Sequence, residues 1–188
     1  PMGFKESLQE ALLVEEEVSN LLRRFGFEVF SNDDKKTNKF YDFSAHSETL
    51  SFTSEVKFDK KATETKRLAI EVFNTRLNRP SGLMATHADC WIQVLDKPRE
   101  IWIAKTSDLR LWVDQNLKHA STFRYGGDKN AYLLCFYKDM ILPSVFMRLD
   151  TIALRFGMDF INNWFLKENN VRSTDGITDT PGLDSIAA

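Results

Sequence analysis

The chain has 188 residues, of which 43% are hydrophobic and 28% charged. These values are typical of a globular protein and allow one domain with a sizeable core. The net charge of −2 does not by itself favour nucleic acid or a membrane surface. No apolar run is long enough to span a bilayer and no signal peptide is recognisable, so we expect a cytoplasmic protein (the host-cell cytoplasm if a phage encodes it). The two cysteines and three histidines are scattered without a CxxC pair, which argues against a zinc site.

The first part of the chain predicts one helix followed by three strands. Apolar residues recur at helical spacing between Phe4 and Phe25, and Gly26 ends the pattern. The predicted apolar stripe consists of Leu8, Ala11, Leu12, Val14, Val18, Leu21, Leu22 and Phe25. Strand-like runs follow at Phe27–Phe30, Phe40–Ala45 and Leu50–Asp59, with polar loops between them.

The second part of the chain alternates strand-like and helical patterns. Strands are predicted at Leu68–Phe73, Cys90–Leu95, Glu100–Ala104 and Tyr132–Tyr137. Helices are predicted at Asp108–Leu117, with Ser107 or Asp108 as its cap, and at Leu149–Leu166. Residues 1–168 should form a single domain, and the polar residues 169–188 a disordered tail. The expected fold is α/β, a mixed β-sheet flanked by helices with an αβββ core.

The stretch Glu55-Val56-Lys57 carries the strongest chemical signal. Side chains alternate along a strand, so Glu55 and Lys57 share one face, about 7 Å apart, while Val56 points to the other. If the two neighbouring runs form a hairpin, Asp42 lies beside Glu55. A Glu-x-Lys triplet alone is a weak signal, because such triplets are common on solvated strands.

Two adjacent carboxylates favour a divalent cation. They repel each other, and hard oxygen ligands with open positions suit Mg²⁺ or Mn²⁺. Such a metal polarises a phosphodiester and helps to ionise water, while Lys57 orients that water or stabilises developing charge. The pattern therefore indicates phosphodiester hydrolysis.

Two further carboxylates are candidates for the same site. At about 100° per residue, Glu15 falls inside the apolar stripe of the first helix, whereas Glu16 and Glu17 fall outside it. Glu71 lies in a strand that is apolar on both faces. Glu15 can equally lie at the edge of the stripe and reach water, and Glu71 can be a structural partner of Lys57 or Arg67.

The order of these features resembles the PD-(D/E)XK nuclease superfamily, with the nearest likeness to archaeal Holliday junction resolvases and phage nucleases. The resemblance rests on the helix with Glu15, the following Leu21-Leu22 and Gly26-Phe27, then Asp42 and Glu55-Val56-Lys57. It implies a restriction-endonuclease-like fold and metal ligation by Asp42, Glu55 and the carbonyl of Val56. It also implies that Lys57 assists the attacking water and that Glu15 completes the site.

The resemblance covers residues 10–75 and is incomplete. Tyr41 replaces the proline usual before the aspartate. The glutamine often found after Glu-x-Lys is absent from its expected place, and Glu71 is the candidate to substitute for it as a further metal ligand. Nothing beyond Arg76 matches a family pattern.

The predicted activity is a Mg²⁺- or Mn²⁺-dependent DNA endonuclease, with branch or structure selectivity left open. Basic residues near the site are candidate phosphate contacts, although solubilising loop charge is the better explanation for any single one of them. These residues are Lys60, Lys61, Lys66, Arg67, Arg76 and Arg79. A homodimer would suit cleavage of two strands. The alternatives are an RNA endonuclease of the cap-snatching type, a non-catalytic nuclease-fold module that binds nucleic acid, and an α/β domain with an accidental Glu-x-Lys.

Overall fold

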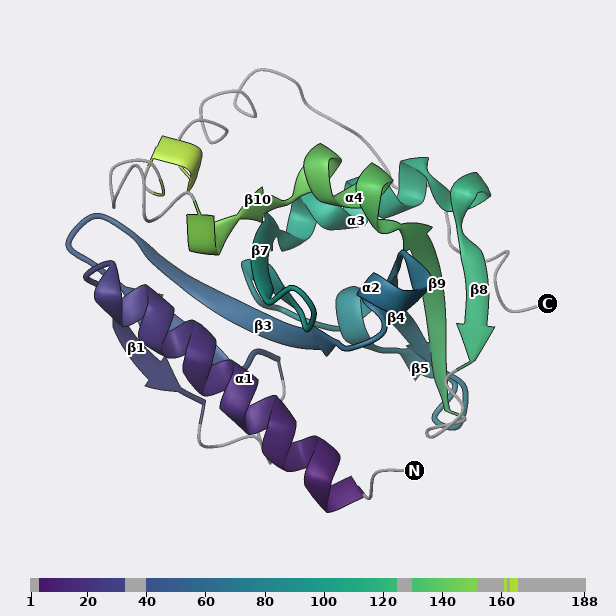
Figure 1. Cartoon of the computed structure of the whole chain (residues 1–188), viewed down its shortest axis with the longest axis horizontal. Helices are drawn as coiled ribbons and strands as arrows, with labels where there is room; N and C mark the ends of the chain where they lie inside the picture. Colours follow the sequence, from purple (N-terminus) through teal and green to yellow (C-terminus); the bar gives the residue numbers. More distant parts are fainter. Residues whose placement is uncertain (1–3, 33–39, 125–129, 152–160, 162, 166–188) are drawn as a thin grey trace.

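The computed structural model of the chain describes residues 4–32, 40–124, 130–151, 161 and 163–165 (Figure 1). A six-stranded sheet has the order β1-β2-β3-β6-β7-β10. Its strands are β1 Glu28–Ser31, β2 Phe43–His46, β3 Ser51–Asp59, β6 Cys90–Leu95, β7 Glu100–Lys105 and β10 Met147–Arg148. Only β3 and β6 pair in parallel among these neighbours, so the sheet is mixed.

A second sheet of four antiparallel strands has the order β5-β4-β9-β8. Its strands are β4 Arg67–Asn74, β5 Arg79–Pro80, β8 Ser121–Arg124 and β9 Ala131–Tyr137. The helices are α1 Phe4–Arg24, α2 Ala62–Thr65, α3 Thr106–Gln115 and α4 Lys138–Val145, with 3-10 turns η1 Gly82–Met84 and η2 Leu117–His119. In the part of the chain described, no helix combines the length and apolar character needed to cross a bilayer.

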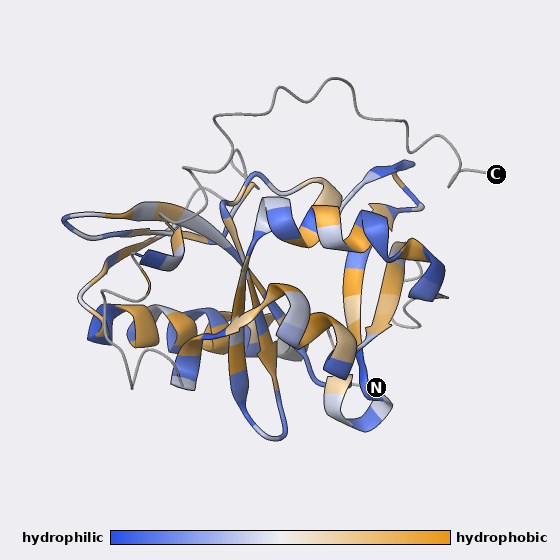
Figure 2. Cartoon of the chain, turned by 90° about the horizontal axis from the view of Figure 1, so that it is seen from above, coloured by the Kyte–Doolittle hydropathy of each residue, from blue (hydrophilic) through white to orange (hydrophobic). Residues whose placement is uncertain are grey.

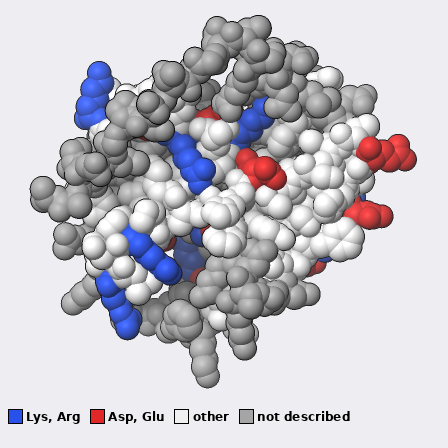
Figure 3. Space-filling view, turned by 180° about the vertical axis from the view of Figure 1, so that it is seen from behind, with Lys and Arg blue, Asp and Glu red and all other residues white. Residues whose placement is uncertain are grey.

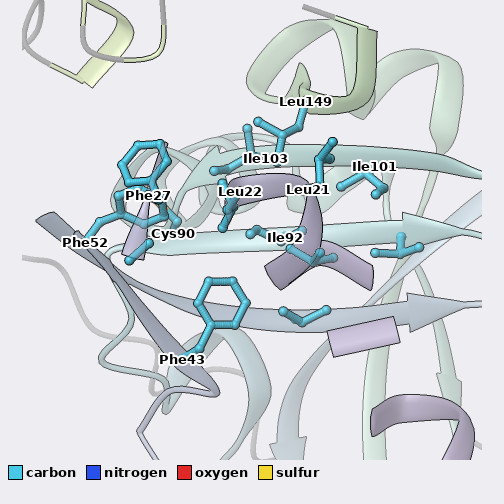
Figure 4. Close-up of a cluster of buried hydrophobic side chains, with 14 of the residues drawn as sticks. Leu21, Leu22, Phe27, Phe43, Phe52, Cys90, Ile92, Ile101, Ile103 and Leu149 are labelled. Carbon is cyan, nitrogen blue, oxygen red and sulfur yellow. The ribbon is translucent and has the colours of Figure 1, made fainter. Parts of the chain in front are cut away.

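Helix α1 covers one face of the six-stranded sheet (Figure 1). Val14, Val18, Leu21 and Leu22 form its buried stripe. They pack in one cluster with side chains from the sheet that include Phe43, Phe52, Val56, Ile92 and Ile103 (Figure 4). Burial of this stripe holds the helix in place, since each fully buried Val or Leu side chain contributes about 1.5–3 kcal/mol.

The opposite face of the six-stranded sheet borders a second core. Trp91, Leu95 and Ala104 belong to this cluster, together with residues of β4, α3, β9 and α4 such as Ile70 and Phe136. All six residues of β6 are buried because the strand has a core on each face. Hydrophobic residues follow the strands along much of their length, whereas the helices show a hydrophobic and a hydrophilic side (Figure 2).

The predicted α/β fold with a mixed sheet, flanking helices and an αβββ beginning is confirmed. Several details were wrong. Leu8 and Leu12 are half exposed, because the buried stripe of α1 begins only at Val14. The second strand begins at Phe43 rather than Phe40. The helix near Asp108 begins at Thr106, and no side chain caps it.

Other parts of the chain were missed or lie outside the described residues. The second sheet as a separate layer and helix α4 were not predicted. Leu149, Asp150 and Thr151 are helical as predicted, but residues 152–160, 162 and 166 of the predicted last helix are outside the described part. The tail 169–188, predicted to be disordered, also lies outside it.

Candidate active site

Strand β3 places Glu55 and Lys57 on the face of the sheet that looks away from α1. Val56, between them, is buried in the cluster beneath α1. The neighbouring strand β6 pairs Glu55 with Trp91 and Lys57 with Gln93, and both partners are buried. The predicted alternation along Glu55-Val56-Lys57 is therefore confirmed, and it directs both charged side chains toward the second core.

Asp42 is tied to β3 by two hydrogen bonds. Its backbone N–H donates to the carbonyl of Ser54 at 2.8 Å. Its Oδ2 accepts the backbone N–H of Val56 at 2.7 Å. Because Phe43 pairs with Ser54 in the antiparallel register of β2 and β3, Asp42 arrives beside Glu55. The hairpin expected from the sequence does bring these two carboxylates together.

Glu55 is an enclosed charged group of the site, with a side chain only 13% exposed. Its Oε1 accepts a hydrogen bond from Lys57 Nζ at 2.5 Å, and its Oε2 lies 3.4 Å from the Thr86 hydroxyl. Burial raises the pKa of Glu55, Lys57 opposes that effect, and the negative charge of Asp42 raises the pKa further. A cation beside both carboxylates would relieve this unfavourable concentration of negative charge.

Lys57 is held between acids and an aromatic ring. Its Nζ lies 5.7 Å from the centroid of the Trp91 ring. Burial by itself lowers the pKa of Lys57, but attraction to Glu55, the hydrogen bond to Glu55, and the charges of Asp42 and Glu71 outweigh it, so the pKa is raised. Lys57 is therefore a cation at neutral pH, and its ammonium donates a hydrogen bond to Glu55.

Asp59 shares the face of Glu55 and Lys57 but serves the backbone. Its carboxylate accepts the N–H groups of Lys61 and Ala62 at 2.9 Å each and that of Ala69 at 3.1 Å. Burial raises the pKa of Asp59 against these three hydrogen bonds. The carboxylate thus fixes the connection from β3 to β4, and with it the second sheet.

Thr86 is a site residue that the sequence did not reveal. Its buried hydroxyl contacts Glu55 and donates to the carbonyl of Phe40 at 2.9 Å. A single threonine in a loop has no periodicity, so no sequence signal identifies it. Gln93, in register with Lys57, was missed for a similar reason: a polar residue within an apolar run carries no indication of its neighbours.

Glu71 and Gly82 lie on the second sheet's side of the site. The charge of Glu71 contributes to the raised pKa of Lys57, which supports the partnership with Lys57 considered for it. Gly82 has a φ of +50°, and a Cβ there would lie 2.4 Å from the carbonyl oxygen of Glu71. The turn η1, which leads into the loop that carries Thr86, therefore passes against Glu71 at a distance that only glycine allows.

Replacement of Gly82 by alanine should destabilise the protein by about 2 kcal/mol or more, because the added Cβ meets backbone and the φ is positive. Urea unfolding would measure the change. Gly26 is the matched control: its φ is +88°, but a Cβ there meets nothing within 4 Å. Gly26→Ala should therefore show the conformational cost without the clash. Equal losses in the two variants would contradict the close approach to Glu71.

Glu15 is partly buried on α1. That helix packs on the face of the sheet opposite to Glu55 and Lys57. Among the described residues, no three His, Cys, Asp or Glu side chains form a group that could hold a metal ion. Glu15 and Glu71 therefore do not complete such a group with Asp42 and Glu55 here, and their role as ligands remains a prediction.

Three of the basic residues predicted to contact DNA have partners within the chain. Lys60 pairs with Glu10, Lys61 with Glu64 at 2.7 Å. The Arg67 guanidinium contacts Ser121 and the Tyr137 hydroxyl, and it lies 4.6 Å from the Tyr137 ring centroid. The others, Lys66, Arg76 and Arg79, are exposed. In the view from behind, basic side chains are separated by uncharged residues (Figure 3).

The donor atoms gathered at Asp42 and Glu55 are chemically suited to Mg²⁺ or Mn²⁺. Both side chains supply hard carboxylate oxygens, and the Thr86 hydroxyl lies next to Glu55. Mg²⁺ is commonly held by one or two carboxylates, with waters and substrate phosphates filling its remaining positions. A pair of carboxylates therefore fits this metal, whereas the zinc sites built from Cys and His do not fit these residues.

No protein-family model matches the chain, and no curated protein matches its sequence. Among solved structures, the fold is similar to that of a bacterial homing endonuclease, I-Ssp6803I, at 12% sequence identity. The match covers 88% of this chain and 96% of that chain, with a TM-score of 0.47. At this identity and TM-score, the likeness assigns neither activity nor site residues.

Proposed function

We propose that the chain is a Mg²⁺- or Mn²⁺-dependent PD-(D/E)XK nuclease that hydrolyses DNA phosphodiester bonds. The observation that carries the proposal is the juxtaposition of Asp42, Glu55 and Lys57. Asp42 Oδ2 is fixed by the Val56 N–H at 2.7 Å, and Glu55 and Lys57 project from the same strand face. Two carboxylates and one ammonium group, carried by β3 and by the residue just before β2, match what metal-assisted phosphoryl hydrolysis requires.

The chain's own residues contribute orientation and charge. A bound divalent cation would polarise the scissile phosphate and lower the pKa of water. Asp42 and Glu55 would hold that cation, and the fixed backbone of β3 would supply the Val56 carbonyl as a third oxygen. Lys57, as a cation, would donate hydrogen bonds to the attacking water or to the phosphate oxygens as charge develops on them.

If Glu55 binds a divalent cation, its carboxylate must contact both the metal ion and its present hydrogen-bond donors. In this structure Oε1 is engaged by Lys57. A divalent cation at Asp42 and Glu55 would compete for that oxygen and leave the Lys57 ammonium directed at the substrate. The negative charges of Asp42 and Glu71 keep the ammonium close to the site in either arrangement.

DNA is the proposed substrate, and exposed Lys66, Arg76 and Arg79 are its candidate phosphate contacts. Glu15 and Glu71 as further ligands, branch or structure selectivity, and a homodimer remain part of the proposal. Catalysis is favoured over a nuclease-fold module that only binds nucleic acid, because such binding does not require two carboxylates beside the Lys57 ammonium.

Metal removal tests the proposal. Purified protein would be incubated with supercoiled plasmid, a four-way DNA junction, single-stranded DNA and RNA, each with Mg²⁺, Mn²⁺ or EDTA. We expect cleavage of DNA with either metal and complete loss in EDTA, restored by excess Mg²⁺. Binding of intact DNA without cleavage under all conditions would instead support the binding module, and cleavage of RNA alone would replace DNA as the substrate.

A further inference from the structure

We propose that Thr86 is a positioning residue that holds Asp42 and Glu55 in their mutual arrangement. This inference rests on the proposed function for its effect on catalysis, but its structural part does not. Thr86 lies in the loop between η1 and β6, far in sequence from both carboxylates. It is buried, and its hydroxyl is the point at which three chain segments meet.

The hydroxyl of Thr86 has three polar neighbours. It accepts the backbone N–H of Ala88 at 3.2 Å. It donates to the carbonyl of Phe40 at 2.9 Å, with Glu55 Oε2 as a second acceptor at 3.4 Å. A hydroxyl has one proton and can rotate, so the same group can favour either acceptor. The Thr86 hydroxyl thus lies between the segment that leads to Asp42 and the carboxylate of Glu55, and it can donate to either.

Two further contacts hold the segment of Asp42 to this loop. The N–H of His87 donates to the same Phe40 carbonyl at 3.0 Å. The rings of Phe40 and His87 are stacked, with centroids 4.0 Å apart and planes inclined by 4°. Phe40 is only two residues from Asp42, so the loop fixes the approach of that carboxylate to β3.

Arg110 of α3 holds the loop itself. Its Nε donates to the carbonyl of Leu83 at 2.9 Å, and its guanidinium also donates to the carbonyl of Thr86 at 2.5 Å. Burial lowers the pKa of Arg110, yet arginine stays charged at neutral pH. A continuous set of contacts therefore runs from α3 through Thr86 to both carboxylates.

Valine and serine separate the hydroxyl from the shape of Thr86. Valine keeps the shape and removes the hydroxyl, whereas serine keeps the hydroxyl. Thr106 provides the matched control, because it is equally buried and its Oγ1 has no hydrogen-bond partner among the described residues. Cleavage kinetics and the Mg²⁺ dependence would be measured for Thr86→Val, Thr86→Ser and Thr106→Val. We expect Thr86→Val to lose about 10- to 100-fold in activity or metal affinity, with the other two within about threefold of wild type.

Amide hydrogen exchange supplies a readout that needs neither metal nor substrate. The N–H of Val56 reports on Asp42 because it donates to Asp42 Oδ2. In the metal-free protein, Thr86→Val should exchange this amide severalfold faster, while Thr86→Ser and Thr106→Val should match wild type.

The outcomes separate this inference from the proposed function. Unchanged Val56 exchange and unchanged cleavage in Thr86→Val would overturn the positioning role. Equal losses in Thr86→Val and Thr86→Ser would assign the effect to shape and overturn the role of the hydroxyl. A wild type that never cleaves, with Val56 exchange faster in Thr86→Val and restored by serine, would support the positioning role and refute the nuclease.

Discussion

Glu55→Gln should reduce metal-dependent DNA cleavage by about 10³-fold or more, since a bound metal contributes several kcal/mol to the transition state. Glutamine keeps the size of the side chain and can still accept a hydrogen bond from Lys57, but it removes the charge that a divalent cation requires. The burial that raises the pKa of Glu55 shows that the fold gains little from this carboxylate in its ionised form.

The fold should therefore survive the change. Glu55→Gln removes the repulsion with Asp42, and Lys57 remains able to reach water because its side chain is 35% exposed. We expect the free energy of unfolding of the metal-free protein to change by at most about 1 kcal/mol.

Three measurements check this result: plasmid cleavage with Mg²⁺, Mn²⁺ binding by calorimetry and urea unfolding. The matched control is Glu64→Gln, because Glu64 is exposed and pairs with Lys61 on the surface. That variant should cleave and bind metal as wild type does. Loss of cleavage in Glu55→Gln with unchanged Mn²⁺ affinity would show that Glu55 is not a metal ligand. Full activity in Glu55→Gln would contradict the nuclease site as a whole.

Lys57→Met should reduce the maximal cleavage rate by about 10²- to 10³-fold, the usual loss when one donor that stabilises transition-state charge is removed. Methionine keeps the length and apolar stem of lysine and can pack over the Trp91 ring. Metal affinity should be retained or increased, because the ammonium no longer competes for Glu55 Oε1. Opposite effects on rate and metal affinity would distinguish Lys57 from a ligand.

The stability effect of Lys57→Met should not depend on pH in the neutral range. The folded state raises the pKa of Lys57. Its stabilising contribution is therefore complete below the unfolded pKa of about 10.4 and is lost only as the pH rises through the higher folded value. The ionisation of Lys57 should therefore leave the difference in unfolding free energy between variant and wild type constant from about pH 7 to about pH 9. Toward acid pH the loss should shrink, because Lys57 lowers the pKa of Glu55 and its removal lets that carboxyl take up a proton more readily.

Lys118→Met is the control for the loss of a lysine outside the site, because Lys118 is exposed and is not a candidate DNA contact. It should cleave DNA at the wild-type rate. Cleavage by Lys57→Met within about threefold of the wild-type rate would show that the Lys57 ammonium has only a structural role. The carboxylates of Asp42 and Glu55 would then act without it.

The sequence by itself determined the local elements and the face on which the site lies. Alternation along β3 put Glu55 and Lys57 on one side and Val56 on the other, because successive side chains of a strand point to opposite faces. Helical spacing located α1, and Gly26 with its positive φ marked its end. The pairing of Asp42 with Glu55 followed from a hairpin, which is a local contact between neighbouring runs.

Only the tertiary structure decided which distant residues complete the site. Thr86 reaches Glu55 because β3 and β6 pair in parallel. Arg110 of α3 contacts the carbonyl of Thr86 in the loop that leads into β6. Such contacts join segments that are far apart in the sequence and share no periodic pattern, so the sequence alone does not predict them. The same limit applies to Leu8 and Leu12: their spacing fits a buried stripe, yet they are half exposed because the buried contact of α1 begins at Val14. Periodicity fixes the direction of a side chain, and only the packing of the whole chain determines what that side chain meets.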